Sequence, residues 1–304
     1  MIVLIGGTGF LGRHVCEVLA ANKLETVSVS RRPDTEFLAE HAPGVRGVRT
    51  DDPALSDILR QAEHVLYFAH RSRPAIHAEG PRMEVSTNLS DVAAFLHTLM
   101  EVNPQARLTY LSSGGQIYGS GFDAPITEDA AIRPATAYGL GKSLVETLLN
   151  YYVDANGSKI AILRLANPVG RWQLNTSHGL VSAAVQASVS GQPLTIFGDG
   201  GNARDYFDAD DFAQWVTNRL ILGPAAVTGT YNIGSGRALT ETDVVETVNR
   251  TLGRPVPYNF AEGRPFDLRY AVLDCGRAER ELGWTPGTGL DETIRKIDQA
   301  LHAT

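Results

Sequence analysis

The first nineteen residues, MIVLIGGTGFLGRHVCEVL (residues 1–19), decide the fold class. A short apolar run from Ile2 to Ile5 precedes Gly6, Gly9 and Gly12, and a helical pattern follows. The first glycine permits a tight turn, the second leaves room for a pyrophosphate, and the third lets the helix pack closely on the strand. The helix N-terminus then offers free N–H groups to the phosphates. Any strand-to-helix turn could use such glycines, but in a βαβ unit they predict a dinucleotide-binding site.

Beyond this stretch the chain keeps alternating short apolar runs with helical patterns, which is typical of βαβ units. We therefore expect an α/β fold, a doubly wound parallel sheet (Rossmann) of at least six strands with a smaller α/β substrate-binding lobe. Glycines and prolines after Asn167 break the pattern and mark the smaller lobe. The predicted domains are 1–165 plus 206–234 for dinucleotide binding, and 166–205 plus 235–304 for the substrate. Expected strands are 2–5, 27–30, 65–69, 108–112, 160–165 and 231–233, and expected helices are 11–21, 55–61, 89–102, 137–154, 241–252 and 291–301.

Composition narrows the class of ligand. The 304 residues are 43% hydrophobic and 20% charged, as in an ordinary globular protein. A net charge of -7 gives no concentrated basic surface for nucleic acid or anionic lipid, so a small-molecule substrate is expected. No apolar run approaches the roughly 20 residues that span a bilayer, which predicts a cytoplasmic protein without membrane contact. Cys16 and Cys275 lie far apart and outside any metal-binding pattern, so we expect buried thiols and no metal.

The end of the second strand bears on the choice of cofactor. An acidic residue there would bind the ribose hydroxyls of NAD, but the sequence is VSVSRRP (residues 27–33). Ser30, Arg31 and Arg32 could instead hold a 2′-phosphate through charge-assisted hydrogen bonds. NADP is therefore favoured and NAD remains possible; a solvated arginine pair is the alternative interpretation.

Two further segments supply candidate catalytic groups. In TAYGLGKSLVETLLNYY (residues 136–152), Tyr138 and Lys142 are four residues apart, so both fall on one helix face. The ammonium can stabilise a phenolate that trades a proton with a substrate hydroxyl. In LTYLSSGGQIYG (residues 108–119), Ser112 and Ser113 follow a buried strand, at the sheet edge where ligands bind. One of the two hydroxyls could stabilise charge on the reacting oxygen, while the other merely closes the strand.

With these elements in place, the chain resembles the extended short-chain dehydrogenases/reductases, and within them the nucleotide-sugar epimerases and dehydratases of the UDP-glucose 4-epimerase type. The resemblance covers nearly the whole length. It rests on motifs in the family's order: GGTGFLG, SSGGQIYG, YGLGK, RLANPVG, GDGGNARDYFDADDFA, YNIGSG and ELGWTP.

The resemblance implies a role for each matching residue. Tyr138 would be the base, Lys142 the anchor of the ribose and nicotinamide, and Ser113 the hydroxyl donor. The positions implied for cofactor binding are Gly6, Gly9, Phe10, Leu11, Gly12, Ser30, Arg31, Arg32, Asp51, Phe68, Ala69, His70, Asn88, Ser112, Tyr138, Lys142 and Leu165. Those implied for the nucleotide-sugar substrate are Asn167, Val181, Thr195, Phe197, Arg204 and Arg269. Two arginine forks suit a diphosphate, although surface pairing of Arg204 with Asp205 and of Arg269 with Asp267 is an alternative.

The chain departs from the family pattern at three places. Gly114 stands where many members have Ser or Thr, which leaves Ser113 to supply the hydroxyl. Gly115 and Gln116 replace the Asp-Glu pair of the dehydratases, so dehydration is disfavoured. The acid expected near the adenine ring is out of register: Arg49 occupies its place and Asp51 and Asp52 follow.

These observations favour a reaction through a transient keto-sugar. The first hypothesis is an NAD(P)-dependent epimerase of a nucleotide-activated sugar, acting at C4, because RLANPVG resembles the epimerase version of its motif. The alternative is an NADPH-dependent nucleotide-keto-sugar reductase, which Ser30-Arg31-Arg32 would suit. A third hypothesis, a non-catalytic NADP-binding regulator, would be expected to lose the Tyr/Lys pair. The resemblance also implies a homodimer, and the choice of sugar would depend on segments 71–81 and 172–179.

Overall fold

The computed structural model describes residues 1–72, 80–173, 179–264 and 266–303, which form two compact units. Unit 1 comprises 1–113, 136–164 and 213–231, and unit 2 comprises 114–135, 165–212 and 232–304. The chain crosses between the units five times, after Ser113, Ala135, Arg164, Phe212 and Tyr231. The substrate-selecting segments expected at 71–81 and 172–179 lie largely outside the described residues.

A seven-stranded sheet forms the centre of unit 1, in the order β10-β6-β5-β4-β1-β2-β3. The pairs β1–β2, β2–β3, β1–β4 and β4–β5 are parallel, and the strand order reverses between β1 and β4. This doubly wound arrangement confirms the predicted fold class, with a seventh strand beyond the six expected. The strands are β1 (Ile2–Ile5), β2 (Thr26–Ser30), β3 (Arg46–Arg49), β4 (His64–Tyr67), β5 (Arg107–Ser113), β6 (Ile160–Leu165) and β10 (Gly229–Ile233).

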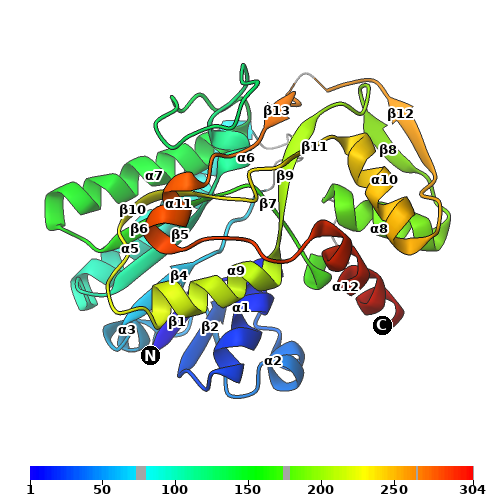
Figure 1. Ribbon diagram of the computed structural model, residues 1–304. Helices are drawn as coiled ribbons and strands as arrows, with labels where there is room; N and C mark the ends of the chain where they lie inside the picture. Colours follow the sequence, from blue (N-terminus) through cyan, green and yellow to red (C-terminus); the bar gives the residue numbers. More distant parts are fainter. Residues whose placement is uncertain (73–79, 174–178, 265, 304) are drawn as a thin grey trace. The chain divides into compact units, whose positions relative to one another are not determined.

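Helices cover both faces of this sheet, with α1 on one face and α5 and α7 on the other (Figure 1). Central parallel strands are buried on both faces, and β1 and β6 are accordingly buried along their whole length, whereas the edge strand β3 (RGVR) has both ends exposed. The helical segments of this unit are α1 (Phe10–Ala21), α2 (Thr35–His41), α3 (Leu55–Arg60), α4 (Gly80–Met83), the π-helix η1 (Glu84–Leu89), α5 (Ser90–Val102), α7 (Ala137–Asn156) and the π-helix η3 (Val216–Ile221).

Helix α7 has clear local reasons for its two ends. The Thr136 hydroxyl accepts a hydrogen bond from the Gly139 N–H at 3.1 Å, which caps the N-terminus. Gly157, at a φ of 63°, ends the helix in the left-handed conformation that glycine adopts without steric cost. The helix therefore runs two residues beyond the expected 137–154, and its start is as predicted.

Unit 2 contains two small sheets and a cluster of helices. Strand β9 lies between β11 and β13 and also pairs with β7, whereas β8 and β12 form a separate parallel pair. Helices α8, α10 and α12 pack on one another around a core rich in valine and isoleucine. The elements are α6 (Gly114–Ile117), β7 (Asn167–Val169), the 3-10 turn η2 (Arg171–Gln173), α8 (Leu180–Ser190), β8 (Leu194–Phe197), β9 (Ala203–Asp208), α9 (Ala209–Trp215), β11 (Ala238–Leu239), α10 (Glu241–Leu252), β12 (Tyr258–Ala261), β13 (Tyr270–Ala271), α11 (Gly276–Leu282) and α12 (Leu290–Ala303).

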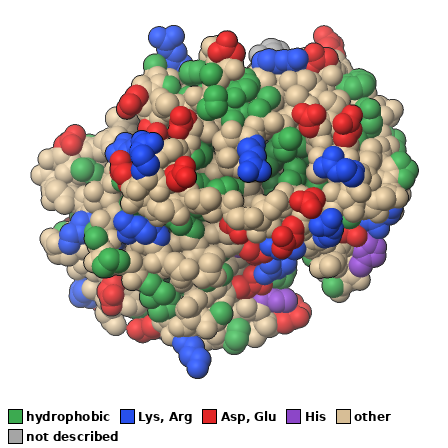
Figure 2. Space-filling model, viewed as in Figure 1, with side chains coloured by type: hydrophobic (Ala, Val, Ile, Leu, Met, Phe, Trp, Pro, Cys, Tyr) green, Lys and Arg blue, Asp and Glu red, His purple; other side chains and the backbone are tan. Residues whose placement is uncertain are grey.

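On the face that Figure 2 shows, basic and acidic side chains are interspersed rather than gathered by sign. Among the described helices, none is both long and apolar enough to cross a membrane. Cys16 is buried in α1, and Cys275 is partly buried.

Candidate active site

The glycine loop between β1 and α1 has the close backbone contacts that its sequence predicts. Gly6 has a φ of 91°, and a Cβ there would lie 2.8 Å from the Ala69 backbone nitrogen. A Cβ on Gly12 would lie 2.3 Å from the Gly6 carbonyl oxygen, so α1 packs directly on the loop. Gly9 is the N-cap of α1; among the described residues no side chain caps this end, and the first turn, which contains Phe10 and Leu11, has no acid. The backbone N–H groups of this first turn are thus available to an anion such as a pyrophosphate.

The ends of the two neighbouring strands lie beside this loop. The Gly6 N–H donates to the Val29 carbonyl in β2 at 2.7 Å, and the N–H groups of Phe68 and Ala69, after β4, donate to the Ile5 carbonyl. The Thr8 and Ser30 hydroxyls are 3.3 Å apart. The predicted cofactor positions of these three segments therefore share one edge of the sheet, where the strand order reverses and where ligands bind in such folds.

Four more predicted cofactor positions have partners or surroundings that the sequence left open. The Arg31 and Arg32 side chains are exposed directly beyond β2. Asp51 accepts two hydrogen bonds of 2.7 Å from Arg49, the residue that displaced the expected acid. Leu165 is buried at the end of β6.

Tyr138, Lys142 and Ser113 lie together in unit 1. The Lys142 ammonium donates to the Leu111 carbonyl of β5 at 2.6 Å and lies 5.8 Å from the Tyr138 ring centroid. Ser113, at the end of β5, forms a side-chain hydrogen bond with Tyr138. The Ser112 hydroxyl is buried without a hydrogen-bond partner among the described residues. Of the two serines, Ser113 is therefore the one in contact with the phenol.

Burial shifts the two titrating groups in opposite directions. It raises the pKa of Tyr138 to about 12, against the hydrogen bond from Ser113, which lowers it. It lowers the pKa of Lys142 to about 7, against the carboxylates of Glu146 and Glu84, which raise it. The phenol is thus protonated at neutral pH and the ammonium is close to its titration midpoint. Proton transfer through Tyr138 needs further positive charge or hydrogen bonding at the phenolate.

His70 and Asn88, both predicted near the cofactor, are joined by Glu84, a buried acid that the sequence analysis missed. The Asn88 side-chain amide donates to Glu84 at 2.8 Å, and His70 Nε2 lies 3.4 Å from the same carboxylate oxygen. The His70 ring meets the Tyr138 ring edge to face at 5.0 Å. Burial and the charge of Lys142 lower the pKa of His70 to about 4, so the imidazole is neutral at pH 7. Glu84 lies in the π-helix η1, which the sequence pattern did not reveal.

The predicted substrate positions all lie in unit 2, but they are not gathered into one contact network. The side-chain amide of Asn167, in β7, donates to the Asp205 carbonyl at 2.9 Å. Val181 is buried in α8, and Thr195 is exposed on β8. The Phe197 ring, also on β8, is covered by the Arg264 guanidinium at 4.2 Å.

Neither arginine proposed for a diphosphate pairs with the acid suggested as its alternative partner. Arg204 donates to the backbone carbonyls of Ala203 and Leu268, at 2.9 and 2.6 Å. Asp205 instead accepts from Ser235 and Gly236. Arg269 contacts Asp199 at 2.5 Å, with both side chains mostly exposed, and Asp267 pairs with Arg264. The alternative interpretation, in which each arginine forms an ion pair with an acid close to it in sequence, therefore does not account for the position of Arg204 or Arg269.

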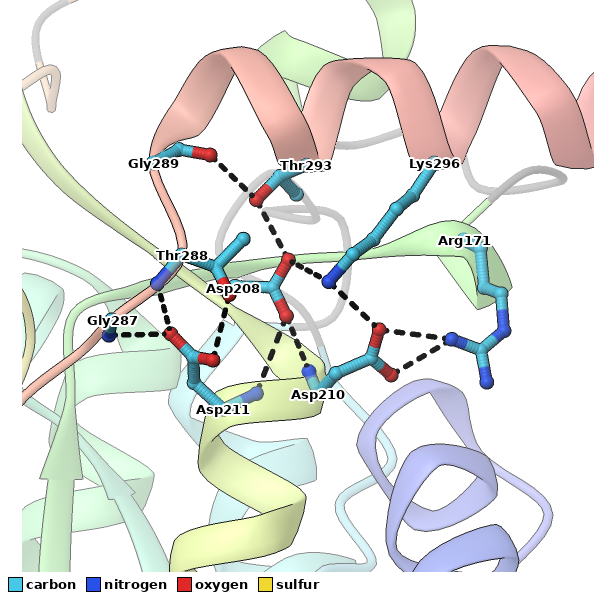
Figure 3. A network of polar contacts seen from close by, with 9 residues as sticks. All are labelled: Arg171, Asp208, Asp210, Asp211, Gly287, Thr288, Gly289, Thr293 and Lys296. Atoms are coloured by element: carbon cyan, nitrogen blue, oxygen red, sulfur yellow. Dashed lines mark hydrogen bonds and ion pairs between the residues drawn. The ribbon is translucent and has the colours of Figure 1, made fainter.

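Strand β9, which carries Arg204, is hydrogen-bonded to helix α12 through the buried carboxylate of Asp208 (Figure 3). Asp208 accepts from the backbone N–H groups of Asp210 and Asp211, and so caps the start of α9. It also accepts from the Thr293 hydroxyl at 2.7 Å and from the Lys296 ammonium at 3.3 Å, both on α12. The Asp208 side chain is only 1% exposed, so the carboxylate is hidden from solvent and depends on these hydrogen bonds in place of hydration.

We expect Asp208→Ala to lower the free energy of unfolding by about 2–4 kcal/mol, because it removes a helix cap and leaves buried donors unsatisfied. Urea unfolding followed by circular dichroism measures this change. The matched control is Asp291→Ala on α12, where the ion pair with Arg295 is about half exposed and should contribute well under about 1 kcal/mol. Equal losses in the two variants would contradict the assigned role of Asp208.

Unit 2 also contains a cavity of about 420 Å³. Its walls include Tyr206, Arg237, Arg250, Cys275 and Trp284, and none of the six substrate positions lines it.

Comparisons with known proteins agree with this geometry. The model of the NAD dependent epimerase/dehydratase family matches residues 2–234. The chain is 27% identical to the dTDP-4-dehydro-6-deoxyglucose reductase of Escherichia coli, over 99% of this chain and 97% of the reductase. It is similar to the structure of UDP-glucose 4-epimerase from Thermotoga maritima with UDP-glucose, with a TM-score of 0.88, 25% identity and coverage of 99% and 98%. It is also similar to the Thermus thermophilus UDP-glucose 4-epimerase in complex with NAD, with a TM-score of 0.82, 28% identity and full coverage of both chains.

Proposed function

Because the chain belongs to the NAD-dependent epimerase/dehydratase family, we propose that it epimerises a nucleotide-activated sugar at C4 through a transient keto-sugar. The observation that carries this proposal is the contact of Tyr138 with Ser113 and Lys142 in the unit that also holds the glycine loop. The similarity to UDP-glucose 4-epimerases along the whole chain supports the choice of reaction, and a uridine diphosphate sugar is the first substrate to test.

The residues of this chain can perform the acid–base part of such a reaction. Tyr138 takes the proton of the sugar hydroxyl and later returns it, while Ser113 donates a hydrogen bond to the same oxygen. The Lys142 ammonium, held by the Leu111 carbonyl, stabilises the phenolate electrostatically. A bound dinucleotide supplies the acceptor and donor of the hydride. The uncapped, acid-free N-terminus of α1 fits its phosphates.

Arg204 and Arg269 are proposed to bind the diphosphate of the substrate. Arg269 lies just before β13, and β13 pairs with β9 such that Ala271 faces Arg204. The two guanidinium groups thus come from adjoining positions of one small sheet. Arg204 keeps its charge but is anchored on carbonyl oxygens, which leaves it preorganised for an anion. We also propose a homodimer through two sheet-flanking helices, one of them α7, which carries Tyr138; Tyr151 on α7 is 65% exposed.

Reduction of a keto-sugar is the second candidate, favoured by the similarity to the Escherichia coli reductase.

One assay separates the possibilities: UDP-glucose, UDP-galactose and dTDP-4-keto-sugars are incubated with the protein, and nicotinamide absorbance and sugar products are followed together. Product without net change in the cofactor supports an epimerase. Stoichiometric loss of NADPH supports a reductase. Binding of the dinucleotide with no turnover on the panel would contradict both and leave a regulatory protein.

NAD is the cofactor bound in the similar Thermus thermophilus structure, and we propose that this chain also accepts NADP and prefers it. The exposed Arg31 and Arg32, directly beyond β2, are the support for this preference. The double variant Arg31→Ala/Arg32→Ala should weaken NADP binding about tenfold to a hundredfold and NAD binding less than about threefold. Calorimetric titration with each dinucleotide measures the two affinities. An equal loss for both would contradict recognition of the 2′-phosphate.

A further inference from the structure

Behind the proposed proton-transfer pair, the same face of α7 carries a third ionisable side chain. Tyr138, Lys142 and Glu146 follow one another at intervals of four residues, so they form a row along the helix. Lys142 and Glu146 are both almost completely buried, at 3% and 2% exposure. An acid and an ammonium one turn apart in a buried site interact much more strongly than on a surface.

Glu146 is fixed in position from the neighbouring strand. Arg164, on β6, donates from Nε at 3.1 Å and from Nη2 at 2.7 Å to the two oxygens of Glu146. Both side chains are buried, at 7% and 2% exposure. Such a fork holds a carboxylate in one orientation, but a buried ion pair contributes little net stability compared with apolar residues of the same size. The electrostatic effect of the Glu146 carboxylate on Lys142 offers a reason why this ion pair lies behind Lys142.

Several other groups face the Lys142 ammonium. The Tyr110 ring centroid lies 4.8 Å from Nζ, and the Leu111 carbonyl accepts its hydrogen bond; both belong to β5. From η1, the Glu84 carboxylate acts in the same direction as Glu146 and raises the pKa of Lys142, with the smaller effect of the two. His70, after β4, is neutral at pH 7 and adds no charge. Glu146 is therefore the main group that opposes the loss of the proton on burial.

We propose that Glu146, held by Arg164, is a positioning residue that favours the charged form of Lys142 in its buried site. Its importance for the reaction rests on the proposed function, because an uncharged Lys142 could not stabilise a phenolate at Tyr138. The charge on Lys142 itself is a property of the folded chain and is independent of any substrate. It can thus be tested even if the proposed reaction is wrong.

The sequence makes a direct test possible, because it contains only four lysines: Lys23, Lys142, Lys159 and Lys296. Protein labelled with ¹³C at the lysine Cε positions should give four resolvable NMR signals, and Lys142→Met assigns the relevant one. Without dinucleotide or substrate, Lys142 should titrate near pH 7. Lys296, next to Asp208 and Asp210, should titrate above its ordinary range, and so serves as an internal reference.

Glu146→Gln removes the charge and keeps an oxygen that can accept from Arg164. We expect the midpoint of Lys142 to fall by about one unit, which is a tenfold lower ratio of charged to neutral lysine at a given pH, with the other three midpoints unchanged. Asp154→Asn, an exposed acid on the same helix, should leave all four midpoints in place. If Glu146→Gln does not fold, because Arg164 is left unpaired, Glu146→Gln/Arg164→Met gives the same readout. A folded variant of either kind with Lys142 at its wild-type midpoint would overturn the proposal.

Discussion

Tyr138→Phe is expected to lower kcat by roughly 10²–10⁴-fold, whichever of the two sugar reactions the enzyme performs. The substitution removes only the hydroxyl that exchanges a proton with the substrate. The ring remains, so its edge-to-face contact with His70 and its place above the Lys142 ammonium should persist. Steady-state turnover of the sugar substrate, measured at saturating dinucleotide, gives the loss.

Two controls separate lost chemistry from lost structure. Dinucleotide affinity and unfolding temperature should stay close to those of the wild type, because Tyr138→Phe leaves the glycine loop and the packing of α7 intact. Tyr152→Phe, the same change further along α7, should alter turnover less than about twofold. Turnover by Tyr138→Phe within tenfold of the wild-type rate would show that another group moves the proton.

The sequence allowed those parts of the site to be predicted that depend on local geometry. Gly6 and Gly12 were assigned to a tight turn and a close helix contact, and the close approaches that a Cβ would make at both positions agree. Tyr138 and Lys142 were expected on one face because helical spacing places residues four apart side by side. Glu146 continues that row, so the same reasoning could have found it.

Other contacts depend on tertiary structure, and no local pattern could reveal them. Glu84 reaches His70 through a π-helix, whose irregular turn has no periodic sequence signal. Arg204 donates to the carbonyl of Leu268, which is distant in sequence and approaches only when β13 pairs with β9. Asp199 was likewise not expected as the partner of Arg269.

The arrangement within unit 1 also explains why its proton-transfer groups are sensitive to small changes in charge. Burial raises the pKa of Tyr138 and lowers that of Lys142, so it favours the neutral form of both. Catalysis needs the opposite forms, a phenolate beside an ammonium. Carboxylates that favour the ammonium, and hydrogen bonds that favour the phenolate, therefore decide how much active protein is present at neutral pH.

Gly12→Ala is expected to have the largest effect on dinucleotide binding. The added Cβ would lie 2.3 Å from the Gly6 carbonyl oxygen and 2.7 Å from two Gly7 backbone atoms. Backbone cannot swing aside as a flexible side chain can, so α1 must move away from the loop that presents its N–H groups to the phosphates. We expect at least a hundredfold loss of dinucleotide affinity, on the scale of about 3 kcal/mol, with a stability loss of about 1–3 kcal/mol.

Isothermal titration calorimetry with NAD and NADP measures the affinity without any catalytic step, and heat unfolding measures the stability. Gly287→Ala is the matched control, because a Cβ there would meet nothing within 4 Å, and both measurements should change little. An affinity within threefold of the wild-type value in Gly12→Ala would mean that the phosphates do not lie at the N-terminus of α1. In that case the dinucleotide site would have to be sought elsewhere in the chain, and the assignment of Tyr138 as the proton-transfer group would lose its main structural support.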